Sequence, residues 1–318
     1  MLWLYIFVFA ASCAVLAKSG AWLVKSLTRI ARYLQMTEFA VAFILMAFAT
    51  TLPEFFVGVT SALSGRPELS FGNVFGSNII NLSFVAGMGA LVAKGLKCQG
   101  RVIQRISIYT LVIAFLPILL MLDGSVSRVD GIILLLALAF YMQRLFYQSE
   151  RFTKVFSNHF LRDWQRFKLF LKDLFVFVFS LGLLLLSAKG VVWSSVFLAS
   201  ALNLPLVVLG TLIVAFGTNL PEIVFGIKAI AMGHKDMILG NLLGAVVSNS
   251  TLVLGVTVLI SPLTVPSLAP YLIGIFFVVA ALIFFITFSI TGWGISRREA
   301  LFLLLLYAVF VVLEIWWA

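Results

Sequence analysis

The chain has 318 residues, of which 63% are hydrophobic and only 11% are charged, and its formal net charge is +10. Soluble domains carry about 25% charged residues, so the composition excludes a soluble protein and a soluble domain with a single anchor. The apolar runs are continuous rather than alternating, which also excludes a transmembrane β-barrel.

Apolar stretches of about 20 residues, long enough to cross a bilayer, recur along the whole chain. We predict an all-α integral membrane protein with ten transmembrane helices, at residues 2–24, 38–62, 70–93, 103–122, 128–147, 172–198, 204–230, 238–261, 268–290 and 298–316. The first stretch lacks a basic leader and a clear cleavage site, so we expect a retained helix rather than a signal peptide.

Most basic residues cluster in alternate predicted loops, and the opposite side has only Arg66, Arg128 and Lys189. The positive-inside rule therefore predicts that both termini are extracytoplasmic and that the basic loops are cytoplasmic. The positive charge is explained by orientation and by contact with anionic headgroups of the lipid bilayer. We expect no nucleic-acid partner, and we expect a monomer.

One segment of the chain is duplicated. Residues 47–87 and 215–255 align without a gap and share 14 identities in 41 positions. Both copies contain Thr-x-Leu-Pro-Glu, which ends at Glu54 or Glu222, followed by Gly-Asn-x-x-Gly. Duplicated, Pro-broken membrane helices with a buried carboxylate are typical of cation transporters.

The loop at 148–171 divides the chain into two halves of five spans, 1–147 and 172–318. Because five is odd, the second half enters the membrane in the opposite orientation. We therefore predict inverted repeats whose motifs meet near the midplane and support alternating access. The loop itself mixes aromatic and basic residues, which predicts an amphipathic helix on the cytoplasmic surface.

Glu54 and Glu222 are predicted to be the only acidic residues deep in apolar helices. An unpaired carboxylate there costs several kcal/mol, and no basic residue lies at matching depth in the neighbouring spans. Both must therefore be protonated or paired with a bound cation. Two neutral Glu that merely hold helices together would not explain why the surrounding motif is duplicated.

Oxygen-bearing groups accompany the carboxylates. Helical spacing puts Thr50 beside Glu54, Thr218 beside Glu222, and Ser77 beside Asn81. Pro53 and Pro221 loosen the preceding turns and free carbonyl oxygens there, including the turns that contain Ala47 and Ala215. Hard cations such as Ca²⁺ prefer these ligands, and no Cys or His belongs to the set, which argues against soft transition metals.

The Gly-Asn-x-x-Gly runs have two kinds of residue with different expected roles. Their glycines, Gly72, Gly76, Gly240 and Gly244, have the spacing of close helix packing. Asn73 and Asn241 either support the loosened turns of the neighbouring helix or bond across the bundle.

On these motifs the chain resembles the sodium/calcium exchanger branch of the Ca²⁺/cation antiporter superfamily, prokaryotic type, over nearly its whole length. The resemblance implies a plasma-membrane location and a central site in spans 2, 3, 7 and 8, served by sliding of spans 1 and 6. It implies Glu54 and Glu222 as the main Ca²⁺ ligands. Further oxygens would come from Thr50, Thr51, Ser77, Asn81, Thr218 and the carbonyls of Ala47 and Ala215.

The second repeat departs from the family pattern at Asn219, at Ala245 in place of a Ser, and at Asn249, where many sodium-coupled members have Asp. The site's fixed charge is therefore at most −2, which predicts exchange of one Ca²⁺ for two monovalent cations, because a third would leave uncompensated charge in low dielectric. The Pro-Glu pairs favour Na⁺. The missing hydroxyl at Ala245 and the amides at Asn219 and Asn249 weaken Na⁺ sites and favour H⁺, so coupling to H⁺ stays the alternative.

Two other classes of protein were considered. A channel usually builds its filter on an oligomer axis, whereas duplication inside one chain favours a closed two-sided site. An intramembrane enzyme would need a nucleophile with a base or a His-containing metal site, and no predicted span contains His. We expect no cofactor, only the transported ions Ca²⁺ and Na⁺ or H⁺.

Overall fold

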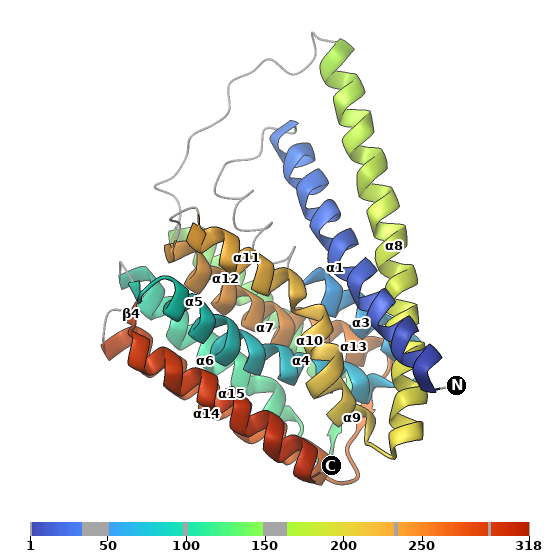
Figure 1. The fold of residues 1–318 in the computed structure, drawn as a ribbon, viewed down its shortest axis with the longest axis vertical. Helices are drawn as coiled ribbons and strands as arrows, with labels where there is room; N and C mark the ends of the chain where they lie inside the picture. Colours follow the sequence, from blue (N-terminus) through green and yellow to red (C-terminus); the bar gives the residue numbers. More distant parts are fainter. Residues whose placement is uncertain are drawn as a thin grey trace.

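The computed structural model describes residues 2–33, 51–97, 101–148, 164–231, 235–291 and 294–317. The chain is largely helical, and both described ends of the chain lie at the same end of the molecule (Figure 1). The helices are α1 (Leu2–Tyr33), α3 (Leu52–Leu63), α4 (Pro67–Ile79), α5 (Ala86–Val92), α6 (Arg101–Leu120), α7 (Arg128–Gln148), α8 (Trp164–Leu202), α9 (Leu206–Leu209), α10 (Ala215–Thr218), α11 (Leu220–Ala231), α12 (Lys235–Ser248), α13 (Leu254–Ile260), α14 (Ala269–Thr291) and α15 (Arg297–Trp317).

Three π-helical turns interrupt these helices: η1 (Ile80–Val85), η2 (Gly210–Val214) and η3 (Asn249–Val253). The predicted third, seventh and eighth spans are therefore compound, as α4–η1–α5, α9–η2–α10–α11 and α12–η3–α13. Within the described ranges, six helices are long and apolar enough to cross a membrane, and three further apolar helices are shorter. The predicted second span begins at residues outside the described ranges.

Two helices are longer than the sequence indicated. α1 continues to Tyr33, beyond the predicted end at 24, and α8 begins at Trp164 rather than at 172. The final residues of the predicted linker are thus continuous with a membrane helix, since no Pro or Gly interrupts them. The amphipathic helix predicted for the rest of that loop lies outside the described residues.

The all-α prediction missed two short antiparallel strand pairs. β1 (Leu96–Lys97) pairs with β4 (Gly294–Ile295), and β2 (Ser125–Val126) pairs with β3 (Leu263–Thr264). Backbone polar groups at the ends of spans need hydrogen-bond partners, and these pairs supply them. Each pair joins a loop of the first half of the chain to a loop of the second half.

Glycines bring the two halves into close contact. A Cβ at Gly72 would collide with the Val207 carbonyl, and one at Gly76 with the Thr211 carbonyl. α4 therefore packs backbone to backbone against α9 and η2, as the spacing of these glycines predicted. Gly240 has no atom of the described residues within 4 Å of an added Cβ, so its packing role stays a prediction.

α1 and α8 form a pair that is side by side along much of their length (Figure 1). Near one end Arg29 donates to Asp173 at 3.0 Å. Near the other, the Tyr5 ring stacks on Phe197 with centroids 3.4 Å apart. The pair packs around an apolar cluster that includes Leu16, Leu184 and Val191, together with Val57 of α3 and Leu209 of α9.

We expect Gly76→Ala to destabilise the fold, because the new Cβ cannot fit against the Thr211 carbonyl. Overpacking of this kind costs about 1–3 kcal/mol, so the thermal unfolding midpoint in detergent should fall. Gly182→Ala is the matched control, since its Cβ would meet nothing within 4 Å. Equal midpoints for the two variants would contradict the close approach.

Candidate cation site

Glu54 lies in the first turn of α3, which begins at Leu52. Pro53 is tolerated in a first turn because the N–H it lacks would have no helical acceptor there. The unpaired N–H groups of that turn favour a nearby carboxylate. The Glu54 side chain is nevertheless fully buried, so it sits in the helix bundle and not in solvent.

Glu222 occupies the equivalent position in α11. α10 ends at Thr218, Asn219 lies at the junction, and α11 begins at Leu220. Glu222 is 1% exposed. The helix break predicted from Pro221 is present in this second copy, whereas the turn that precedes Pro53 lies largely outside the described residues.

The motifs of the two halves meet at α4 and α10. Thr218 Oγ1 donates to Asn73 Oδ1 at 3.0 Å, and Asn219 Nδ2 donates to Ser77 Oγ at 2.6 Å. The Glu54 carboxyl group faces Thr218 and Ser77. Asn73 thus bonds to the broken segment of the neighbouring helix, which is the first of the two roles considered for it.

Each Glu-bearing helix also contacts a π-helical turn of the opposite half. α3 contacts η3, which begins at Asn249, and α11 contacts η1, which contains Asn81. Asn81 and Asn249 are counterparts in the duplicated segments. π-Turns inside α-helices often occur at functional sites, and here both copies place an amide in such a turn.

Several buried polar atoms have no hydrogen-bond partner in the part of the chain that the structure describes. They include both Glu54 carboxyl oxygens, both amide atoms of Asn81, and the Oδ1 atoms of Asn219 and Asn249. Buried polar atoms are normally satisfied, so their concentration around the two motifs leaves oxygens available for a bound cation.

The Ala215 carbonyl oxygen, in contrast, already has hydrogen-bond partners. It accepts hydrogen bonds from the Asn219 backbone N–H at 3.1 Å, from Asn219 Nδ2 at 2.7 Å and from Thr218 Oγ1 at 3.2 Å. A cation that uses this carbonyl must displace a side-chain donor. Among the other predicted ligands, Thr51 is buried, while Thr50 and Ala47 lie outside the described residues.

No group of three or more His, Cys, Asp or Glu side chains occurs within the described ranges. A cation held between these helices must therefore complete its shell with hydroxyl, amide and carbonyl oxygens. That set suits Na⁺ and Ca²⁺ rather than soft transition metals.

Sequence reasoning missed a polar network beside the site. Asn78 Nδ2 donates to Ser250 Oγ at 3.0 Å, and Asn249 Nδ2 donates to Asn78 Oδ1 at 3.3 Å. The counterpart of Asn78 in the second copy is Val246, so the duplication does not mark it. An amide beside Ser77 in an apolar run was the signal that could have found it.

The expectation that only two carboxylates are deeply buried is wrong. Glu314 of α15 is 2% exposed, and it lines a cavity of about 110 Å³ with Pro205, Pro270 and Trp317 among its neighbours. Glu314 lies near the end of the last predicted span, at 298–316. Packing of α15 against the bundle buries it.

The family model described as sodium/calcium exchanger protein matches residues 4–147 and 172–316. The chain belongs to this family. It is 27% identical over 93% of its length to the sodium/calcium exchanger MaX1 of Methanosarcina acetivorans, covering 94% of that protein. It is also 27% identical to the putative antiporter CaxA of Alkalimonas amylolytica, with 73% of each chain covered.

The fold agrees with this membership. The sodium-calcium exchanger NCX_Mj, in a structure from crystals soaked with Na⁺ and Sr²⁺, superposes with a TM-score of 0.66 at 23% identity. The match covers 98% of this chain and 99% of that one. The unmatched stretch of the family model, between 147 and 172, coincides with the predicted linker.

Asn78→Leu should destabilise the protein, because it leaves the Asn249 amide without an acceptor and Ser250 without a donor. A buried polar group left unsatisfied costs about 1–3 kcal/mol, read as a lower thermal unfolding midpoint. Ser289→Ala is the control, since that buried hydroxyl has no partner among the described residues. A loss no larger than in the control would contradict the network.

Proposed function

We propose that the protein is a secondary antiporter that exchanges Ca²⁺ for monovalent cations at a site containing Glu54 and Glu222. Family membership supports transport of cations across a membrane. The observation that carries the proposal is the Glu54 carboxyl group: it is fully buried, faces Ser77 and Thr218 from both halves, and has no hydrogen-bond partner among the described residues.

The proposed ligand set keeps the residues named from the sequence. Ca²⁺ would bind the two carboxylates and oxygens drawn from Thr50, Thr51, Ser77, Asn81, Thr218, Asn219, Asn249 and the carbonyls of Ala47 and Ala215. The unpartnered amide oxygens of Asn219 and Asn249 support their inclusion. Six to eight oxygens are what Ca²⁺ requires.

The proposal includes ten membrane helices in two inverted repeats, with both termini extracytoplasmic in a plasma membrane. The strand pairs support the inversion. The 168-residue offset of the duplicated motifs carries β1 to within one residue of β3, and β2 to within one residue of β4. The offset therefore maps the pair β1–β4 onto the pair β3–β2. Two halves related by a pseudo-two-fold axis are expected to show this exchange, and the proposal places that axis in the membrane plane.

The charge of the site sets the proposed stoichiometry. One Ca²⁺ neutralises two carboxylates, and so do two Na⁺ or two protons. Because an excess charge in a low-dielectric interior is costly, exchange of one Ca²⁺ for two monovalent cations would move no net charge. Alternating access would then carry the site between the two sides of the membrane in a neutral state whichever ions are bound.

Coupling to protons is the second candidate. One observation favours it: the Asn219 amide nitrogen already donates to Ser77 Oγ and to the Ala215 carbonyl, which are two of the oxygens that Na⁺ would use. Ala245 also lacks the hydroxyl of its counterpart Ser77. Two Glu that carry protons would not need either ligand.

Ca²⁺ uptake into proteoliposomes loaded with Na⁺ tests the proposal, with Glu54→Gln and Glu222→Gln as variants. Each variant removes one of the two charges that hold Ca²⁺, so uptake should fall at least 100-fold, as a loss of about 3 kcal/mol or more implies. Glu299→Gln is the control, because Glu299 is partly exposed, lies at the start of α15 outside both motifs, and accepts a hydrogen bond from the Ser296 N–H.

Vesicles with a proton gradient and no Na⁺ are compared in the same assay. Uptake that needs Na⁺ supports sodium coupling, and uptake driven only by protons supports the second candidate. Ca²⁺ uptake that persists in both Gln variants would contradict the proposed site.

Asn249→Asp should convert neutral exchange into exchange that carries current. The third carboxylate raises the site's fixed charge to −3, so three Na⁺ become the neutral load while one Ca²⁺ leaves one negative charge. Current recordings on reconstituted membranes should detect net charge movement in the variant and none in the unmodified protein. Net current in the unmodified protein would refute the two-for-one stoichiometry.

A further inference from the structure

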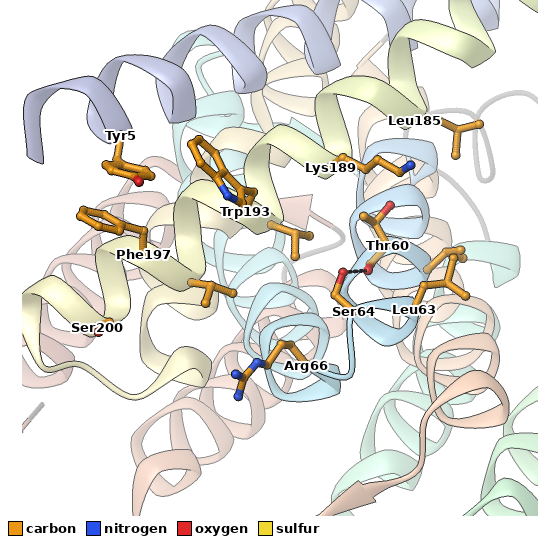
Figure 2. Close-up of a pocket in the computed structure, with 13 residues that line it drawn as sticks. Tyr5, Thr60, Leu63, Ser64, Arg66, Leu185, Lys189, Trp193, Phe197 and Ser200 are labelled. Atoms are coloured by element: carbon orange, nitrogen blue, oxygen red, sulfur yellow. Dashed lines mark hydrogen bonds between the residues drawn. The ribbon is translucent and has the colours of Figure 1, made fainter. Parts of the chain in front are cut away.

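A groove separate from the two motifs opens between α1, α3 and α8, with a volume of about 880 Å³. Its wall includes Tyr5 of α1, the last turns of α3 and one face of α8 (Figure 2). Leu63 is 72% exposed and Trp193 is 55% exposed. These side chains lie on apolar helices, so the groove faces the region that a bilayer occupies.

Two cationic side chains line the groove. Arg66 directly precedes α4, and Lys189 lies inside α8. Both are exposed, and neither forms an ion pair within the described ranges. None of the described residues that line the groove is acidic; Glu68, the nearest in sequence to Arg66, lies close to Tyr271 of α14. The groove therefore repels cations and suits an anion.

The two cations flank a polar strip. Figure 2 shows Thr60 and Ser64 between Lys189 on one side and Arg66 on the other. The surrounding stretch of α8 is strongly apolar, with a mean hydropathy of 2.3. A lysine in such a helix is costly unless its ammonium reaches water or an anionic group. An anionic headgroup placed over the strip would lie between the two cationic side chains, and the Ser64 hydroxyl already donates to the Thr60 carbonyl at 2.8 Å.

The rest of the groove is apolar and aromatic. Leu63, Leu185 and Val196 line it. The Tyr5 ring lies 4.8 Å from that of Trp193 and stacks on Phe197. Burial of apolar surface stabilises a ligand that has hydrocarbon chains and does nothing for inorganic phosphate. Tyr and Trp also favour the level of the lipid headgroups.

We propose that this groove binds a bilayer phospholipid with an anionic headgroup. The anionic headgroup lies between Arg66 and Lys189, beside the Thr60 hydroxyl group, and an acyl chain follows Leu63 and Leu185. The inference does not rest on the transport proposed above, because it uses none of the motif residues.

Quenching of tryptophan fluorescence tests the proposal on the full-length protein in bilayers. Phosphatidylglycerol or phosphatidylcholine with brominated acyl chains is added to a phosphatidylcholine bilayer at matched mole fractions. The Trp193 signal is the difference in tryptophan fluorescence between the unmodified protein and the Trp193→Phe variant. Phosphatidylglycerol should half-quench this signal at a mole fraction several-fold lower than phosphatidylcholine does.

The double variant Arg66→Gln with Lys189→Gln should abolish the difference between the two lipids. Arg128→Gln is the matched control, since Arg128 is an exposed basic residue at the start of α7, outside the groove. Circular dichroism and gel filtration verify that each variant is folded.

Equal quenching of Trp193 by both lipids would overturn the proposal. A preference for phosphatidylglycerol that survives in the double variant would overturn it as well. Protection of Trp193 from both lipids, together with a dimer on gel filtration, would assign the groove to a second copy of the chain instead.

Discussion

The arrangement of this protein depends on two buried carboxylates, Glu54 and Glu222. Each sits in the first turn of a helix, α3 or α11, whose N-terminal dipole gives only partial compensation. Buried carboxylates in apolar surroundings need a counter-charge or a proton. The helix break before Glu222, the π-turns that contain Asn81 and Asn249, and the close glycine contacts of α4 all lie in the duplicated segments that carry these two groups.

The two copies of the motif have diverged, and the differences give the site an asymmetry. Asn219 stands where the first copy has Thr51, and its amide nitrogen crosses to Ser77, whose own counterpart is Ala245. The Ser77 hydroxyl of the first half therefore accepts a hydrogen bond from an amide of the second half, which has no hydroxyl at the equivalent position. Exact symmetry would make the surroundings of the two carboxylates equivalent, whereas the Asn219–Ser77 hydrogen bond has no counterpart between Thr51 and Ala245, which has no side-chain oxygen.

The membrane class, most span positions and the family were predictable, because apolar length and the repeated Thr-x-Leu-Pro-Glu element are local signals. The contacts between elements were not. Asn78–Ser250, the Arg29–Asp173 ion pair and the strand pairs each join residues far apart in sequence. The π-turns at Asn81 and Asn249 carry no side-chain signature. Burial of Glu314 depends on how α15 packs, which its hydropathy alone does not specify.

α1 is positioned to link the α1–α8 pair to both motifs. A Cβ on Gly20 would lie 3.5 Å from the Pro53 ring, and Cys13 lies against Gly217. Each contact is adjacent to a motif: Pro53 precedes Glu54, and Gly217 precedes Thr218. The pair is held together by an ion pair at one end and stacked rings at the other. The apolar cluster around the pair also includes Val57 of α3 and Leu209 of α9, so a displacement of the pair would act on both motifs through this packing and through the contacts at Pro53 and Gly217.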